Sequence, residues 1–203
     1  MIEFLFSQYK EVSTQNIILE FVAFVFGLVS VFYAKKRNVL VYPTGLVATI
    51  ISVYLLYKAN YFGDMAMNFY YSIMSIYGWI IWSNTSKNNI VSISKINFKE
   101  KITGIVLFLL TLVFTYLIYQ FFEYEIELLN YIDILTSGIF FTAMWYMAKK
   151  KIENWTLWII GDIITVPLYA YRGLGMLALQ YLIFTIIAIY AYLEWKKLLQ
   201  KKI

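Results

Sequence analysis

The chain has 203 residues, of which 62% are hydrophobic, 20% aromatic and only 14% charged, whereas a soluble domain of this length is far more polar. Its apolar residues come in blocks of roughly 20, the length that crosses a bilayer core of about 30 Å, so we interpret the chain as an integral membrane protein. It contains no cysteine and no histidine, which excludes disulfides, thiol nucleophiles, imidazole acid–base chemistry and histidine metal sites.

The hydropathy pattern predicts an all-α membrane protein with seven transmembrane helices. The first 16 residues show no basic region followed by an apolar core and a small-residue cleavage site, so we expect no cleaved signal peptide. In chain order, the predicted spans cover residues 17–34, 39–57, 65–83, 102–121, 132–148, 155–171 and 175–194.

The distribution of lysine and arginine predicts the orientation. Seven spans place the two termini on opposite sides. The N-terminal side carries Lys10, Lys58 and Arg172, and the other side carries the remaining 14 of the 17 basic residues. By the positive-inside rule, the N-terminus lies outside and the C-terminus in the cytoplasm. We therefore read the basic excess as topology information rather than as affinity for nucleic acid.

The outward loops are acidic in this topology. Two interpretations stay open: an acidic mouth that concentrates a cationic solute, or ordinary solvated loop charges. The residues concerned are Asp64, Glu123, Glu125, Glu127 and Asp133.

The chain contains a weak internal duplication. RNVLVYPTG (37–45) aligns with ENWTLWIIG (153–161), and MNFYYSIMSIYGWIIW (67–82) aligns with QYLIFTIIAIYAYLEW (180–195). A copy with three spans begins and ends on opposite sides of the membrane, so a second copy that followed directly would be inverted. One extra span between the copies gives them the same orientation, in a 3+1+3 arrangement. Parallel repeats are typical of one class of secondary transporter, with the substrate site near the midplane between them. A helical bundle with chance similarity is the alternative.

This arrangement divides the chain into five predicted parts. They are an extracytoplasmic N-terminal segment (1–16), a first three-helix repeat (17–83), a cytoplasmic loop with a connector helix (84–121), a second three-helix repeat (132–195) and a basic cytoplasmic tail (196–203).

The sixth span carries an aspartate in the middle of an apolar run. Helical spacing places Trp155, Trp158, Asp162, Thr165 and Tyr169 on one face. A charge near mid-bilayer costs at least a few kcal/mol, so it must face protein or water and have a partner. No Lys or Arg lies in the apolar part of any span. Asp162 is therefore protonated, accepts hydrogen bonds, or meets a cation from outside. Flanking aromatic rings suit a flat cationic ligand.

Other polar side chains inside the spans are weaker candidates. Asn68 and Tyr71 share a face of span three, and Gln180 lies at almost the depth of Asn68 in the second copy. Each is also consistent with interhelical hydrogen bonding. Span five carries Asp133, Thr136, Ser137 and Phe140 on one face. Tryptophans near helix ends usually form an interfacial belt, which suits Trp82 and Trp195 and is a second reading of Trp155.

The segment ENWTLWIIGDIITVPLYAYRGLG followed by LQYLIFTIIAIYAYLEWKK resembles the last two helices of the Pnu-type vitamin transporters, best known as nicotinamide riboside transporters. NFYYSIMSIYGWIIW resembles their third helix. The W-x-x-W pair in span six is their hallmark, and it falls on Trp155 and Trp158 with Asp162 as the next polar position. The resemblance implies a fold similar to that of the SWEET sugar transporters, a homotrimer, and a bacterial cytoplasmic (inner) membrane location.

The resemblance also implies the function. Members take up B-type vitamins by facilitated diffusion, and a cytoplasmic kinase traps the substrate, here as a step toward NAD biosynthesis. We expect nicotinamide riboside as substrate, with thiamine as the alternative, because both are flat cationic rings with hydroxyl-bearing groups. No cofactor or metal is expected. A membrane enzyme is disfavoured, since no nucleophile–base cluster appears, and a scaffold or receptor subunit without transport is the third class. The predicted substrate-binding residues are Trp155, Trp158, Asp162, Asn68, Gln180, Tyr71, Thr165 and Tyr169.

Overall fold

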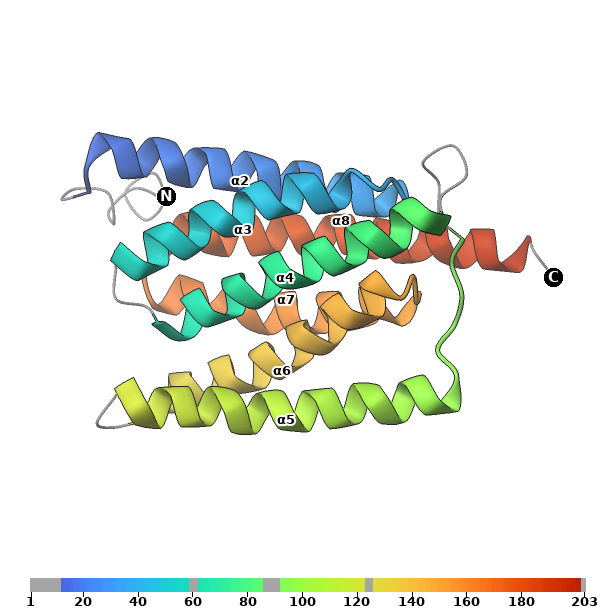
Figure 1. Cartoon of the computed structure of the whole chain (residues 1–203). Helices are drawn as coiled ribbons and strands as arrows, with labels where there is room; N and C mark the ends of the chain where they lie inside the picture. Colours follow the sequence, from blue (N-terminus) through green and yellow to red (C-terminus); the bar gives the residue numbers. More distant parts are fainter. Residues whose placement is uncertain (1–11, 59–61, 86–91, 123–125, 202–203) are drawn as a thin grey trace.

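The computed structural model of the chain describes residues 12–58, 62–85, 92–122 and 126–201 and is built from long helices (Figure 1). The helices are α2 (Thr14–Lys35), α3 (Val41–Lys58), α4 (Phe62–Thr85), α5 (Phe98–Phe122), α6 (Leu128–Ala148), α7 (Glu153–Tyr171) and α8 (Gly175–Gln200). Each predicted span corresponds to one of these helices, and the boundaries agree to within four residues except that α8 continues six residues beyond the predicted end. The predicted all-α, seven-helix fold is confirmed.

Among the described helices, five are long and apolar enough to cross a membrane by length and composition: α2, α3, α5, α6 and α8. The other two, α4 and α7, have 24 and 19 residues, which is also long enough. They are less apolar because they carry polar and tyrosine side chains, among them Asn68 on α4 and Asp162 on α7. Both helices contribute polar side chains to the cavity described below.

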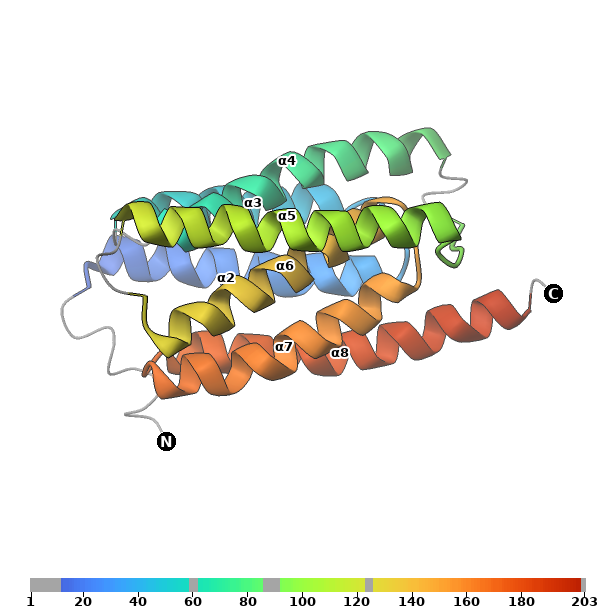
Figure 2. The same cartoon turned by 90° about the horizontal axis from the view of Figure 1, so that it is seen from below.

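Six of the helices form a closed ring. Neighbours pack in the order α2, α3, α4, α6, α7 and α8, and α8 packs back on α2. α5 lies outside the ring against α6, with a smaller contact to α4 (Figures 1 and 2). In Figure 1, α2, α4, α6 and α8 run in one direction and α3, α5 and α7 run in the other. The first repeat (α2–α4) and the second (α6–α8) are therefore parallel, joined by the connector α5.

The two repeats correspond at residue numbers that differ by 113. The loop after α2 has a left-handed residue at Arg37 (φ 58°), and the loop after α6 has one at Lys150 (φ 62°). Around them the backbone hydrogen bonds match one for one: Asn38 N–H donates to Tyr33 O, and Lys151 N–H donates to Tyr146 O. The predicted alignment of 67–82 with 180–195 has this register. The predicted alignment of 37–45 with 153–161 is wrong by three residues, because the shared Asn and Gly identities are coincidental.

The ring is sealed at the end where α2 and α6 terminate, which we call the basic end. Trp82 and Trp195 are fully buried there. The indole Nε1 of Trp82 donates to Ala148 O (3.3 Å), and that of Trp195 donates to Lys35 O (3.1 Å). The two bonds obey the 113-residue correspondence and link each repeat to the other. The predicted interfacial-belt role for both tryptophans is therefore wrong.

Edge-to-face ring pairs reinforce this seal. The Tyr42 ring meets Trp82 at 5.1 Å and 88°, and the Trp155 ring meets Trp195 at 5.5 Å and 90°. Tyr42 and Trp155 are again related by 113 residues. Trp155 is only 2% exposed, so it too is a buried residue rather than part of an interfacial belt.

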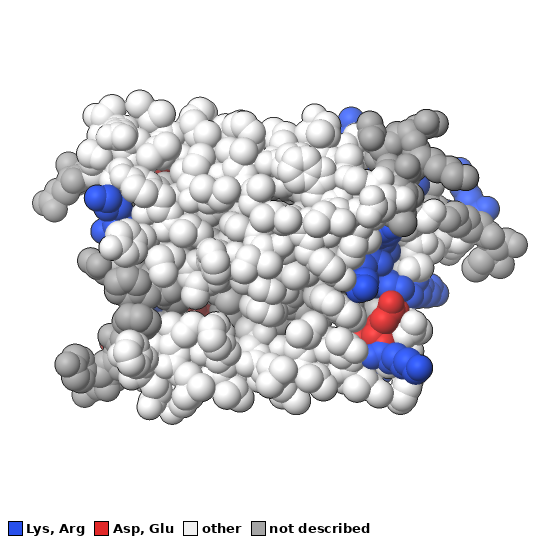
Figure 3. Space-filling view, in the orientation of Figure 1, with Lys and Arg blue, Asp and Glu red and all other residues white. Residues whose placement is uncertain are grey.

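The segment that leads into α5 is attached to the second repeat at this end. Ser94 N–H donates to Lys150 O (3.1 Å) and Ile152 N–H donates to Ser94 O (3.0 Å). A salt bridge joins Lys151 to Glu100 at the start of α5 (2.8 Å). Figure 3 shows that basic side chains gather at this end of the molecule, whereas the surface between the two ends is largely uncharged. That uncharged band fits a lipid-facing surface.

We predict that Trp82→Phe and Trp195→Phe lower the thermal stability in detergent by similar amounts, on the order of 1–3 kcal/mol each, because each leaves a buried carbonyl without its donor. Trp79→Phe is the matched control, since Trp79 on the same helix is 41% exposed. Thermal unfolding is the measurement. Equal losses in Trp82→Phe and Trp79→Phe would contradict the proposed seal.

Candidate substrate-binding site

The helix ring encloses a cavity of about 1190 Å³. Its lining begins at Val12 and Ser13, where α2 starts, and includes Arg172 in the loop between α7 and α8. Toward the basic end the lining includes Ala34, Val41, Met147 and the rings of Tyr42 and Trp155, which pack on the sealing tryptophans, but neither Trp82 nor Trp195. The cavity therefore reaches the opposite end of the bundle, which we call the open end, and ends blind at the basic end.

All eight predicted site residues line this one cavity. They come from α4 (Asn68, Tyr71), α7 (Trp155, Trp158, Asp162, Thr165, Tyr169) and α8 (Gln180). The shared helical face of α7 explains five of them, since a single stripe of that helix points inward. That these residues contact a substrate stays a prediction.

Asp162 places a buried carboxyl group beside the cavity. It is 1% exposed, and its Oδ1 has no hydrogen-bond partner among the described residues. None of the ion pairs found between described residues includes it. Thr165, one turn away, donates its hydroxyl proton to Gly161 O (2.8 Å), so that proton is not directed at the carboxylate. The carboxylate thus retains unused capacity to accept a hydrogen bond or meet a positive charge.

Stacked aromatic rings form the wall beside Asp162. Trp158 stacks on Phe140 (centroids 5.3 Å apart, 27° between planes), and Phe140 stacks on Tyr181 (5.9 Å, 29°). Tyr71 lies 6.3 Å from Trp158, and Tyr169 lies 5.3 Å from Tyr181. Such a wall offers flat π surfaces to a planar ligand.

Phe140 and Tyr181 were not among the predicted site residues. Phe140 comes from α6, and its ring packs directly on α7 because Gly161 there has no side chain. A Cβ at Gly161 would clash with the Phe140 ring. The sequence shows Phe140 on the inner face of span five and Tyr181 next to Gln180. It does not show that their rings meet Trp158, because contacts between helices depend on helix rotation.

The two tryptophans of the W-x-x-W pair have different positions. Trp158 is half-buried in the aromatic wall. Trp155 lies at the blind end, packed edge-on against Trp195, and its Nε1 has no hydrogen-bond partner within the described part of the chain. Trp155 therefore belongs both to the cavity floor and to the seal.

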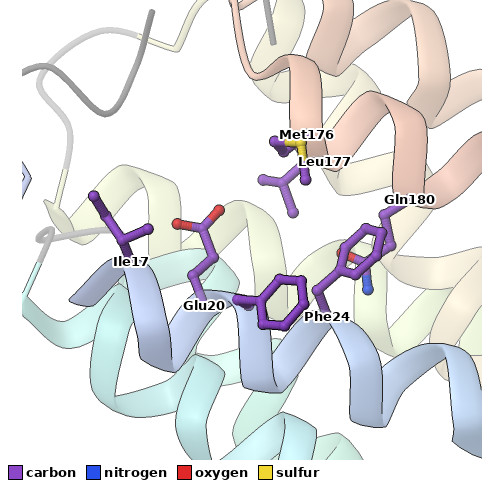
Figure 4. Close-up of a pocket in the computed structure, with 7 residues that line it drawn as sticks. Ile17, Glu20, Phe24, Met176, Leu177 and Gln180 are labelled. Atoms are coloured by element: carbon purple, nitrogen blue, oxygen red, sulfur yellow. The ribbon is translucent and has the colours of Figure 1, made fainter. Parts of the chain in front are cut away.

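The side-chain amides of Asn68 and Gln180 contact different parts of the molecule. The Asn68 amide nitrogen donates to Asp64 O (3.0 Å). Gln180 lies against Gly27 of α2, where an added Cβ would be 3.1 Å from Gln180 Nε2. Gln180 also lines a smaller pocket of about 200 Å³ between α2 and α8, together with Glu20 and Phe24 (Figure 4). Because these residues line the main cavity as well, the small pocket is a side extension of it.

Charged side chains cluster near the open end, but not as the sequence suggested. Asp133 is a buried residue of α6, not a solvated loop charge: Arg172 binds its Oδ2 at 2.6 Å and the Tyr119 hydroxyl donates to the same oxygen at 3.1 Å. Asp64 and Glu127 line the cavity. Glu123 and Glu125 lie outside the described residues.

Comparisons with known proteins agree with this architecture. The family model described as nicotinamide mononucleotide transporter matches residues 17–197. The nicotinamide riboside transporter PnuC of Escherichia coli (strain K12) is 22% identical over 201 residues, covering 87% of this chain and 84% of the relative. The PnuC of Haemophilus influenzae is 25% identical over 192 residues, covering 94% and 84%. A crystal structure of the vitamin B3 transporter PnuC matches with a TM-score of 0.75 at 21% identity, covering 98% of this chain and 90% of that one.

The family match over residues 17–197 identifies a multi-pass membrane transporter, a class of protein that is not an enzyme, and the parallel-repeat helical ring around a cavity agrees with it. The chain belongs to the nicotinamide mononucleotide transporter family, which includes PnuC.

We predict that Gly161→Ala destabilises the protein by about 1–3 kcal/mol through overpacking against Phe140. In a Phe140→Ala background the same change should cost much less, because the clashing ring is gone and neighbouring substitutions are not additive. A thermal-unfolding double-mutant cycle measures this coupling. Equal costs of Gly161→Ala in the two backgrounds would show that Gly161 does not act through Phe140.

Proposed function

We propose that this chain takes up nicotinamide riboside across the bacterial cytoplasmic membrane. The observation that carries the proposal is the buried Asp162 carboxylate, which has an unpartnered oxygen beside the stacked wall of Trp158, Phe140 and Tyr181. A positively charged pyridinium ring complements both features, since it stacks on aromatic faces and balances the carboxylate. The names of the curated relatives support the same substrate.

The charges around the cavity favour the riboside over a phosphorylated form. Among the described residues, the lining contains five carboxylates and two basic side chains, Lys58 and Arg172, and Arg172 is already paired with Asp133. A phosphate group would meet like charge and few free donors. The lining carboxylates are Glu20, Asp64, Glu127, Asp133 and Asp162.

Thiamine is the second candidate. It also has a flat cationic ring, so the pairing of Asp162 with aromatic side chains suits it as well. Nicotinamide riboside carries a hydroxyl-rich sugar on its pyridinium ring, whereas thiamine carries a second aromatic ring and a single hydroxyl group on its thiazolium.

We infer uniport by alternating access. Among the described residues, the cavity lining extends to the end where α2 begins, whereas the Trp82 and Trp195 hydrogen bonds close the basic end. Rocking the two repeats apart at the basic end would break both bonds and open the cavity there, while the open end closes. Trapping by a cytoplasmic kinase would then keep the gradient inward without a coupling ion.

The basic end is cytoplasmic in this proposal, with the N-terminus outside, and we expect the homotrimer that the resemblance implies. The chain has no cysteine, so single-cysteine variants report topology directly. We predict that Tyr171→Cys, at a position 80% exposed near the open end, reacts with a membrane-impermeant maleimide in intact cells. Ser92→Cys, exposed near the basic end, should react only after permeabilisation. The opposite labelling pattern would reverse the proposed orientation.

We predict that purified protein binds nicotinamide riboside with a change in tryptophan fluorescence, and that Asp162→Asn weakens binding about 10- to 100-fold, the loss expected for one charge-assisted interaction of roughly 1.5–3 kcal/mol. Glu194→Gln is the control, because Glu194 pairs with Lys35 on the surface and does not line the cavity. Tighter binding of thiamine than of nicotinamide riboside would select the second candidate. Unchanged affinity in Asp162→Asn would remove the carboxylate from the site.

We also predict that vesicles without kinase take up the vitamin only until the concentrations inside and outside are equal. Radiolabelled uptake into right-side-out vesicles measures this end point, with and without a proton-gradient uncoupler as the control. Accumulation above the external concentration would rule out simple facilitated diffusion.

A further inference from the structure

Helices α4 and α8 present corresponding apolar stripes on the outer surface of the ring. Each helix packs where the two repeats meet, α4 on α6 and α8 on α2. Every residue of the stripes is between 42% and 59% exposed, and residues 69–80 cover about 16 Å of helix, close to the roughly 15 Å of hydrocarbon in one leaflet. Each stripe therefore has the length of an acyl chain in that leaflet. The stripes are Phe69, Ile73, Ile76 and Ile80 on α4, and at the corresponding positions Leu182, Ile186, Ile189 and Leu193 on α8.

A lysine lies over a tyrosine at the basic end of each stripe. Lys149, which follows α6, has its ammonium group 5.8 Å from the ring centroid of Tyr77 on α4. Lys35, the last residue of α2, has its ammonium group 5.6 Å from the ring centroid of Tyr190 on α8. The two tyrosines are corresponding residues, so a lysine of each repeat reaches across to the other repeat. A lysine stem that follows an apolar surface holds its charge at the depth of lipid headgroups.

The two lysines differ in their acidic neighbours. Lys35 forms a salt bridge with Glu194 on α8 (3.0 Å). The corresponding position on α4 is Ile81, which carries no charge. None of the ion pairs found between described residues includes Lys149. The α2–α8 junction is therefore locally neutral, whereas the α4–α6 junction presents a positive charge.

The carboxylates at the nearby starts of α5 and α7 have partners of their own. Glu100 forms the salt bridge with Lys151 (2.8 Å) and also accepts the Asn97 N–H (2.9 Å). Glu153 accepts the Ile96 N–H (3.1 Å). Figure 3 shows basic side chains gathered on this face at the basic end, next to an acidic group. A mobile anion from the membrane is the complementary partner for the charge that remains.

We propose that the junction of α4 and α6 binds an anionic phospholipid, with the phosphate at Lys149 and an acyl chain along the stripe of α4. We call this surface the lipid seam; it consists of Lys149, Tyr77 and the α4 stripe. Charge complementarity selects an anionic headgroup, because the headgroup of a zwitterionic lipid carries its own cation. In the proposed orientation the seam lies in the cytoplasmic leaflet. The lipid seam is outside the cavity, so it does not depend on which vitamin the chain carries.

The test compares two lipids with the same acyl chains, phosphatidylglycerol and phosphatidylcholine. Native mass spectrometry of the full-length protein in detergent counts the lipids bound at each concentration. We expect the first phosphatidylglycerol to bind more tightly than the first phosphatidylcholine. Lys149→Gln should weaken that phosphatidylglycerol about fivefold, the loss expected for one lysine near an anionic headgroup, without changing phosphatidylcholine. Glycerol phosphate, which has no acyl chains, should not displace the lipid.

The second junction supplies matched variants. Lys35→Gln should leave the first phosphatidylglycerol unchanged, because Lys35 is already paired with Glu194. Glu194→Gln removes that acid from a side chain that is 50% exposed, so the fold should tolerate it. It should add a second phosphatidylglycerol of similar affinity, because Lys35 is then a lysine over a tyrosine without an acid, as Lys149 is.

The outcomes decide the lipid seam separately from the proposed function, since no vitamin is present. A loss confined to Lys149→Gln, with a gain in Glu194→Gln, supports the seam. Equal binding of the two lipids, or equal losses in Lys149→Gln and Lys35→Gln, would overturn it, as would displacement by glycerol phosphate. A change of oligomeric state in Lys149→Gln without a change in lipid binding would also overturn it and would assign this surface to a second copy of the chain.

Discussion

Two indole N–H groups, one from each repeat, donate to backbone carbonyls of the opposite repeat at the basic end of the helix ring. The indole rings of Trp82 and Trp195 are fully buried, and a buried carbonyl that loses its donor is costly. Because both lie at one end, they close that end and leave the other free to form a cavity. The depth of the cavity, its blind floor at Trp155 and its access from one side all follow from this placement. They also define what a change to the other conformation must break.

Parallel duplication accounts for the paired geometry of the seal and also for the asymmetry of the site. Each copy supplies the same tryptophan, the same edge-to-face partner position and the same loop hydrogen bonds. The positions that differ between the copies include some that line the cavity, where Phe140 and Trp158 correspond to Gly27 and Gly45. A scaffold that must move as two similar bodies keeps its contacts symmetric, while a ligand without symmetry requires walls that differ.

The sequence predicted the helices and the inward face of α7 because both depend on local periodicity. Trp158, Asp162, Thr165 and Tyr169 repeat at helical spacing, so their common orientation needed no tertiary information. What could not be predicted depends on contacts between helices. Trp82 lies near a helix end, as interfacial-belt residues do. Its burial depends on a helix distant in the sequence, because its indole bonds to a backbone carbonyl 66 positions away. Asp133 likewise meets Arg172 from a distant loop.

Asp133 and Asp162 are both buried carboxylates inside the helix ring, but they differ in their partners. Asp133, near the open end, has a permanent cation and a tyrosine hydroxyl on one oxygen, and a pair of this kind stabilises structure but has little left to offer a ligand. A permanent cation at Asp162 would compete directly with a cationic substrate and would have to be displaced on each transport cycle. That Asp162 forms no ion pair with any described residue therefore fits the proposed role, in which the site binds a cation and then releases it.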